Sequence, residues 1–107
     1  MIAILCAAIH YDDGIKYEHQ PVNITTGFVV AGRRHHNAIL TLYLLRGEEN
    51  LNKEYMGKDS QGFLTSDDRY VTRKEAFRIA KAAGQLLLPS MFDPSDNDIS
   101  LLSEDLY

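Results

Sequence analysis

Residues 61–84 read QGFLTSDDRYVTRKEAFRIAKAAG, and this stretch decides the fold class. It begins with two short runs rich in apolar and β-branched residues, 61–65 and 69–72, on either side of the polar triplet Ser66-Asp67-Asp68. Short runs of this kind around a turn-forming triplet are typical of a β-hairpin. The first half of the stretch therefore predicts two antiparallel strands.

The second half of the stretch predicts a helix that starts at Thr72. Thr72 and Glu75 have the spacing of a capping box, in which each side chain bonds to the free backbone amide of the other residue. Apolar residues follow at helical spacing, and Gly84 lies where a left-handed helix cap is favoured. These apolar residues are Ala76, Phe77, Ile79, Ala80 and Ala83.

Three strands are predicted upstream of this stretch. Residues 2–11 are mostly apolar or β-branched, and Asp13-Gly14 is a strong hairpin-turn signal. Residues 15–20, in which apolar and polar side chains alternate, are therefore expected to return beside the first strand. A third short strand is predicted over residues 28–31.

A first helix is predicted over residues 34–46, where apolar side chains recur every three or four residues before Gly47. Residues 48–60 are mostly polar and are expected to form a loop. The order of elements predicts an α+β fold, a small antiparallel sheet with about two helices packed on one face. With 107 residues, the chain is expected to form a single domain over residues 1–107.

The composition excludes several classes of protein. Hydrophobic residues make up 45% of the chain and charged residues 24%, which excludes wholesale disorder. A net charge of −4 disfavours nucleic acid as a partner. Cys6 is the single cysteine, so the chain has neither a disulfide framework nor a cysteine-based zinc site. The apolar start is too short to span a membrane and lacks the basic residues of a signal peptide, so a cytoplasmic location without membrane contact is expected.

Acidic residues are concentrated near the C-terminus. Residues 93–107 carry five acids and no base. This segment is either a solvated acidic tail or a segment that folds back over a basic surface. Its apolar residues favour the second alternative, because a solvated tail does not need them. They are Ile99, Leu101, Leu102 and Leu106.

The densest run of basic residues lies at the junction between the third strand and the first helix. Arg33, Arg34, His36 and Asn37 stand where a helix exposes its free backbone amides and its partial positive charge. Basic side chains oppose this partial charge unless an anion neutralises them. These four residues are therefore predicted to bind a phosphate or carboxylate group.

Another interpretation of this junction stays open. Arg33 and Arg34 would instead pair with acids such as Asp67 or Glu104, and the junction would bind nothing. His35 is the histidine predicted to face the core. Neither a metal site nor a cofactor is predicted, because no histidine pair or cysteine cluster has the spacing of metal ligands.

The second helix also begins with basic residues, Arg73 and Lys74, and Arg69 lies nearby. Two helix starts with basic side chains favour one shared anion pocket between them. Phe63 or Tyr70 would then offer a ring on which a nucleobase could stack.

The combination GRRHH…QGFxTS…VxRxEA…AGQ…SEDLY, spread over residues 32–107, resembles a family of small proteins encoded by tailed bacteriophages and prophages. The resemblance implies a protein made in the cytoplasm of the infected host, and motif residues that cluster in one site. The expected ligand-binding residues are Arg33, Arg34, His36, Asn37, Phe63, Thr65, Ser66, Arg73 and Glu104.

Small phage proteins include a class that sequesters nucleotide signals of bacterial immunity. By analogy with that class, the leading hypothesis is a phage accessory protein that binds an anionic nucleotide-type ligand, with such sequestration as its use. One alternative is a small hydrolase or transferase acting on a phosphate-containing or ADP-ribose-like substrate, with His36 and Glu104 as acid and base. Another is a protein–protein inhibitor of a host factor. Binding is favoured over catalysis, because no nucleophile has a recognisable context. A homo-oligomer would use the edge of the first strand.

Overall fold

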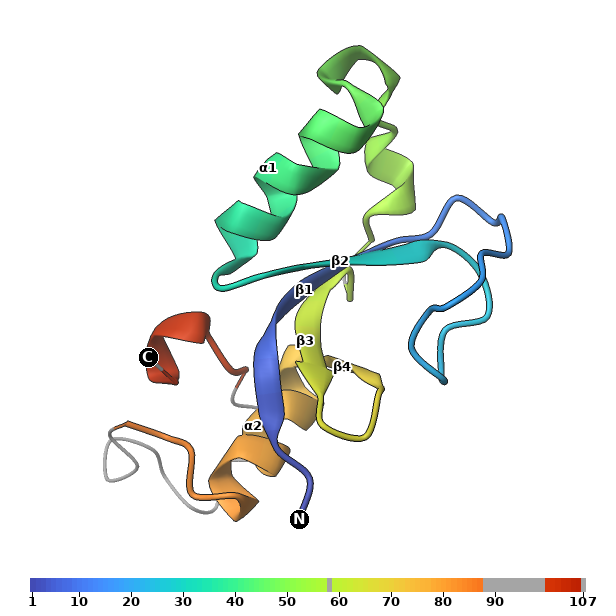
Figure 1. Ribbon diagram of the computed structural model, residues 1–107. Helices are drawn as coiled ribbons and strands as arrows, with labels where there is room; N and C mark the ends of the chain where they lie inside the picture. Colours follow the sequence, from blue (N-terminus) through green and yellow to red (C-terminus); the bar gives the residue numbers. More distant parts are fainter. Residues whose placement is uncertain (58, 88–99, 107) are drawn as a thin grey trace.

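The computed structural model describes residues 1–57, 59–87 and 100–106 and contains one four-stranded sheet with two helices (Figure 1). The strand order is β2-β1-β3-β4, and each neighbouring pair is antiparallel. The predicted α+β fold with a small antiparallel sheet is thus confirmed. The strands are β1 (Ile4–Tyr11), β2 (Phe28–Gly32), β3 (Gln61–Thr65) and β4 (Tyr70–Thr72), and the helices are α1 (His35–Arg46) and α2 (Arg73–Ala82).

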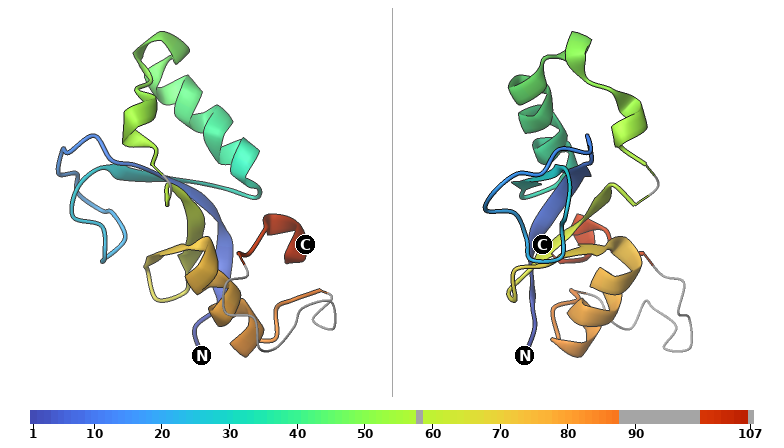
Figure 2. Two further views of the ribbon diagram at one scale, coloured as in Figure 1. Left: turned by 180° about the vertical axis from the view of Figure 1, so that it is seen from behind. Right: turned by 90° about the vertical axis from the view of Figure 1, so that its right-hand side faces the viewer.

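Both helices cover the same face of the sheet. Ala7 pairs with Phe63 and Ile9 pairs with Val30, and cross-strand partners share a face. Ile9 and Val30 pack with Ala38 of α1, whereas Ala7 and Phe63 belong to the cluster that includes α2. Figures 1 and 2 show α1 at one end of the twisted sheet and α2 at the other. The core is therefore divided into two clusters along β1.

The predicted hairpin at Asp13-Gly14 is wrong. β1 pairs with β2, and within residues 12–27 the only sheet-like contact is a single bridge from Lys16 to Gly27. The Asp13 carboxylate accepts a hydrogen bond from the backbone of Ile15 at 3.0 Å and pairs with Arg46 of α1 at 3.3 Å. An aspartate that bonds its own backbone forms a local turn in place of strand pairing.

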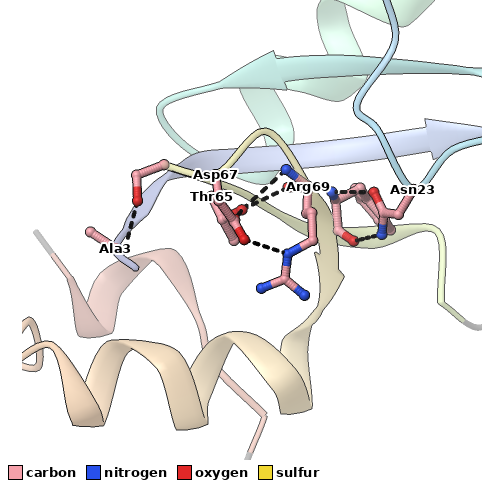
Figure 3. Close-up of polar contacts among 7 residues, drawn as sticks. Ala3, Asn23, Thr65, Asp67 and Arg69 are labelled. Carbon is pink, nitrogen blue, oxygen red and sulfur yellow. Dashed lines mark hydrogen bonds and ion pairs between the residues drawn. The ribbon is translucent and has the colours of Figure 1, made fainter. Parts of the chain in front are cut away.

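Residues 12–27 instead form a long connection beside the sheet. The side chain of Asn23 donates to the carbonyl oxygen of Tyr70 at 2.6 Å and accepts from its backbone N–H at 2.8 Å, which covers part of β4 (Figure 3). Gln20 accepts from the backbone N–H of Val29 at 2.9 Å in the same way. Side chains of this connection thus form hydrogen bonds with backbone groups of both outer strands of the sheet.

The expectation that β1 offers an edge to another copy is wrong, because β1 lies between β2 and β3. β2 pairs with β1 only from Ala7 onward. At Ile4, the side chain of Gln85 takes the place of β2 as the hydrogen-bond partner of the β1 backbone. The Gln85 amide accepts from the Ile4 N–H at 2.7 Å and donates to the Ile4 carbonyl at 2.8 Å. Gly84, at a φ of 70°, turns the chain toward this contact after α2.

The C-terminal segment folds back on the domain over its described part, residues 100–106. Leu101 is fully buried in the cluster around α2, and its N–H donates to the carbonyl of Arg73 at 3.0 Å. A short 3-10 helix, η4 (Ser103–Asp105), follows, and the Leu87 N–H donates to the Asp105 carbonyl at 2.9 Å. Docking is therefore confirmed for these residues, while 93–99 and 107 lie outside the described residues.

The polar stretch after α1 has more structure than the loop expected there. It contains two 3-10 helices, η1 (Glu48–Asn50) and η2 (Lys53–Tyr55). Leu51 and Met56 pack against the cluster under α1. The Tyr11 hydroxyl accepts from the Asn52 N–H at 3.0 Å. These contacts hold the stretch close to the sheet.

We expect Thr72→Ala to lower the free energy of unfolding by about 1 kcal/mol. The predicted cap is confirmed, since the Thr72 hydroxyl accepts from the Glu75 N–H at 3.3 Å. Thr72→Ser keeps the oxygen and should lose much less. Urea unfolding of both variants measures the difference, and an alanine variant as stable as the wild type would show that the cap contributes nothing.

We also expect Gln85→Ala to cost roughly 1–3 kcal/mol, because it leaves the N–H and the carbonyl of Ile4 without their partners. Gln85→Glu keeps an acceptor for the N–H but places a carboxylate against the carbonyl, so it should also destabilise. Lys81→Ala, at an exposed position of α2, is the control. Equal stability of all three variants in urea would contradict this account of the β1 edge.

Candidate ligand-binding site

The predicted anion site at the start of α1 lies in a tight turn from β2. Arg34 is the N-cap residue, and its N–H donates to the Asn37 side chain at 3.1 Å. No acid stands in the first turn of α1. Arg33, His36 and Asn37 are exposed, whereas Arg34 is half-buried. The basic residues thus gather at a helix start, as the sequence predicted.

The C-terminal segment supplies polar partners to Arg34. The guanidinium donates to the Ser103 hydroxyl at 3.3 Å and lies 3.8 Å from the Glu104 carboxylate. Glu104 was predicted to bind the ligand together with Arg34, yet here the two side chains form an ion pair. Arg34 therefore pairs with an acid of the chain, as the alternative interpretation of this junction expected.

His35 is buried beneath this turn, as predicted. Its Nε2 lies 2.8 Å from the carbonyl oxygen of Gly62, so this nitrogen must carry the proton and donate it. The imidazole also meets the ring of Phe63 edge to face, with 5.0 Å between the centroids. Burial lowers the pKa of His35 below its usual 6.5, and the nearby charge of Arg73 lowers it further. His35 thus joins α1 to β3 as a neutral side chain.

Phe63, Thr65 and Ser66 do not join the basic cluster. Phe63 and Thr65 are buried, so neither offers a surface to a ligand. The Thr65 hydroxyl donates to the Asp67 carboxylate within the turn between β3 and β4 (Figure 3). Ser66 accepts from the Ala3 N–H at 2.9 Å. Thr65 and Ser66 therefore stabilise a turn, and Asp67 is the ion-pair partner of Arg69 at 2.7 Å.

A cleft of about 430 Å³ lies elsewhere on the helix-covered face, between α1 and the segment that contains η2. Ile9 and Gln61, which are paired across β1 and β3, lie on the sheet side of it. α1 contributes an aliphatic and an aromatic side chain, and the η2 segment contributes the opposite wall. The lining residues are Ile9, Ile39, Tyr43, Lys53, Met56, Gly57, Ser60, Gln61 and Arg73.

Arg73 is the arginine among the residues that line this cleft. One guanidinium nitrogen donates to the Gln61 side chain at 2.6 Å. Nε is buried and has no hydrogen-bond partner among the described residues. A buried donor without an acceptor costs roughly 1–3 kcal/mol, and more when it is charged. A buried group left in this condition requires an explanation, and an acceptor from outside the chain is one.

Arg73 and Gln61 also border a second cleft of about 180 Å³ at the start of α2. Thr72, Lys74 and Ser100 line it together with one acid, Asp59. The two clefts are therefore neighbours that share the same pair of side chains. Of the nine residues expected to bind the ligand, only Arg73 lines either of these clefts.

Three of the polar or aromatic residues in the larger cleft, Tyr43, Lys53 and Gln61, were not predicted from the sequence. Tyr43 fits the apolar pattern of a helix, and Lys53 lies in the stretch expected to be a loop. Gln61 is the first residue of the QGFxTS motif, but it was not among the expected ligand-binding residues. Knowledge of the strand register would have identified Gln61, since the pairing of Ile9 with Gln61 places it on the helix-covered face.

The proposed acid–base pair of the enzyme alternative finds no support in the contacts. No contact between His36 and Glu104 is present in the described part of the chain, where Glu104 is instead paired with Arg34. Nor do three His, Cys, Asp or Glu side chains come together as possible metal ligands within residues 1–57, 59–87 and 100–106. The cationic cleft around Arg73 is therefore the chemical feature that needs a function.

Comparison of the sequence with models of known protein families gives a match over most of the chain. The family model described as phage T4 y16D protein matches residues 3–107. The chain belongs to this family. Membership of the y16D family confirms the resemblance to small phage proteins. No curated protein and no solved structure matches the chain. None of the helices in the described ranges has the length and apolar character of a membrane span.

The buried His35 predicts a dependence of stability on pH. Its pKa is lowered on folding, so below about pH 6.5 the unfolded chain binds more protons than the folded one. Stability should be complete above that pH and fall as the pH decreases from 6.5 toward the lowered pKa. His35→Gln keeps an amide donor for Gly62 but cannot titrate, so its melting temperature should depend less on pH.

His36→Gln is the matched control, because the neighbouring histidine is exposed. Thermal melts between about pH 8 and pH 5 compare the three proteins. The His36 variant should follow the wild type. A His35 variant with the wild-type pH dependence would show that another group is responsible.

Proposed function

We propose that this phage accessory protein binds a small anionic ligand of nucleotide type in the cleft between α1 and the η2 segment. The observation that supports the proposal most is the buried Nε of Arg73, which lacks an acceptor among the described residues at the border of two clefts. An oxygen of an anionic ligand would satisfy this donor once the side chain turns Nε toward the cleft. Arginine suits the task, because its planar guanidinium can donate two parallel bonds to a phosphate or carboxylate.

The charge of the larger cleft supports an anion. Lys53 and Arg73 line it, and no acid is among its described lining residues. The chain as a whole carries a net charge of −4, so a cationic cleft departs from the bulk charge. Cations that line one cleft raise the local concentration of anions.

The apolar part of the cleft supports a ring. Ile9, Ile39 and Met56 provide aliphatic or thioether surface, and Tyr43 provides an aromatic ring that is partly exposed. Bases stack on such rings with little dependence on their identity. The Gln61 side chain lies between the apolar part and Arg73, where it would also bond to polar edges of a ligand. A ligand with a flat ring and an anionic group matches this arrangement.

Sequestration of a nucleotide immune signal of the host would be one use of such a site. The proposal needs no catalytic group, and it is consistent with a protein that a phage makes during infection. Native mass spectrometry of the protein recovered from infected cells tests this use. A bound compound released intact by denaturation indicates storage, while a chemically altered one indicates turnover.

Binding itself is tested by calorimetry with cyclic and linear mononucleotides and with inorganic phosphate. We expect Arg73→Ala to weaken binding about tenfold or more, because a charge-assisted hydrogen bond contributes roughly 1.5–3 kcal/mol. Arg73→Lys keeps the charge without the paired donors and should bind with intermediate affinity.

Arg78→Ala is the matched control, since Arg78 is an exposed arginine of α2 outside the lining of both clefts. It should bind as the wild type does. Melting of the ligand-free variants establishes that each one is folded. Absence of binding to every compound, or equal affinities of the Arg73 and Arg78 variants, would overturn the proposal.

A further inference from the structure

The two clefts that share Gln61 and Arg73 differ in size and in chemistry. The larger one, of about 430 Å³, combines apolar side chains with Lys53 and Arg73 and has no acid among its described lining residues. The smaller one, of about 180 Å³, is lined by two hydroxyl-bearing side chains and one acid, Asp59. Ligand clefts usually enclose about 300–1,000 Å³, so the smaller cleft suits one part of a ligand and not a whole one.

The pair of side chains that borders both clefts presents hydrogen-bond donors to a ligand. An arginine donates and never accepts, so the amide oxygen of Gln61 must face Arg73, from which it accepts at 2.6 Å. The amide nitrogen of Gln61 is thereby left to donate. Together with the guanidinium, it offers donors to two oxygens of one phosphate group. A phosphate held by this pair therefore adjoins both clefts.

The smaller cleft calls for a group that donates as well as accepts. The Asp59 carboxylate only accepts, and it forms no ion pair in the part of the chain that the structure describes. Ser100 adds a hydroxyl, while the hydroxyl of Thr72 is already bonded to Glu75 in the helix cap. Lys74 also lines the cleft and already has an interaction within the chain. A further phosphate would bring negative charge against Asp59, whereas sugar hydroxyls would donate to it.

We propose that the anionic ligand is a phosphodiester, in which the phosphate joins a nucleoside to a second group rich in hydroxyls, such as another nucleoside. This inference rests on the proposed function, because it assigns the chemical class of the ligand bound at Arg73. The first base lies in the larger cleft, where Tyr43 provides a ring. The phosphate contacts Arg73 and Gln61, and the second sugar lies in the smaller cleft, where its hydroxyls donate to Asp59.

Calorimetry with three adenosine compounds tests the proposal, namely the dinucleoside monophosphate, the methyl ester of AMP, and ADP. The methyl ester has the same diester charge as the dinucleoside phosphate but lacks the second sugar. The wild type should bind the dinucleoside phosphate at least about tenfold more tightly than the methyl ester, because hydrogen bonds from the second sugar to a carboxylate are charge-assisted. ADP should bind less tightly than the dinucleoside phosphate, since its second phosphate would face Asp59.

Asp59→Ala should reduce the preference for the dinucleoside phosphate over the methyl ester at least about threefold, because it removes the acceptor for the second sugar. Glu18→Ala is the matched control, since Glu18 is an exposed acid outside the lining of both clefts. It should keep the wild-type preference. Circular dichroism of the ligand-free proteins establishes that each variant is folded.

The possible outcomes separate this inference from the proposed function. Equal affinities for the dinucleoside phosphate and the methyl ester would overturn the phosphodiester assignment. An unchanged preference in the Asp59 variant would do the same, and so would tighter binding of ADP. In each of these cases, weaker binding by Arg73→Ala would still support an anion site at Arg73. If neither these compounds nor the mononucleotides bind, the proposed function fails and this inference fails with it.

Discussion

The structure depends on the burial of the central residues of β1, Ala7, Ala8 and Ile9, on both faces of the strand. Ala7 and Ala8 point to opposite faces of the sheet, and both are completely buried. The helices cover the face of Ala7, and the connection formed by residues 12–27 lies against the other, where His10 bonds to the carbonyl of Thr26 at 2.9 Å. A strand with both faces covered must also have its polar backbone groups paired along both edges. β2 and β3 supply those partners, and Gln85 supplies them where β2 does not reach.

Two glycines allow the elements around β1 to approach closely. A Cβ on Gly62 would lie 2.1 Å from the carbonyl oxygen of Val71, and a Cβ on Gly32 would lie 2.7 Å from the backbone nitrogen of Ala38. Side chains at these positions would separate β3 from β4 and α1 from β2. Because α1 starts so close to the sheet, His35 reaches the carbonyl of Gly62. The same close approach leaves the far side of α1 exposed.

The parts of the fold that could be predicted are those with local signals. Thr72 and Gly84 define α2 within a dozen residues, and the hairpin before it needs only its own turn. The connection 12–27 could not be predicted, because Asp13 is held by Arg46, 33 positions later in the chain. The larger cleft was missed for the same reason. Its lining comes from β1, α1, the η2 segment, β3 and the first residue of α2. No short sequence motif indicates that these elements lie side by side.

The basic residues at the two helix starts differ in how the chain partners them. At α1, the acidic C-terminal segment places Ser103 and Glu104 beside Arg34, so part of the positive charge is balanced within the protein. At α2, the described part of this segment, residues 100–106, bonds to the backbone of Arg73, where the Leu101 N–H donates to the Arg73 carbonyl. The guanidinium donates to the neutral side chain of Gln61, and it forms no ion pair with an acid within residues 1–57, 59–87 and 100–106. The physical argument for an anion, which the sequence placed first at α1, therefore applies with greater force to Arg73 at the start of α2.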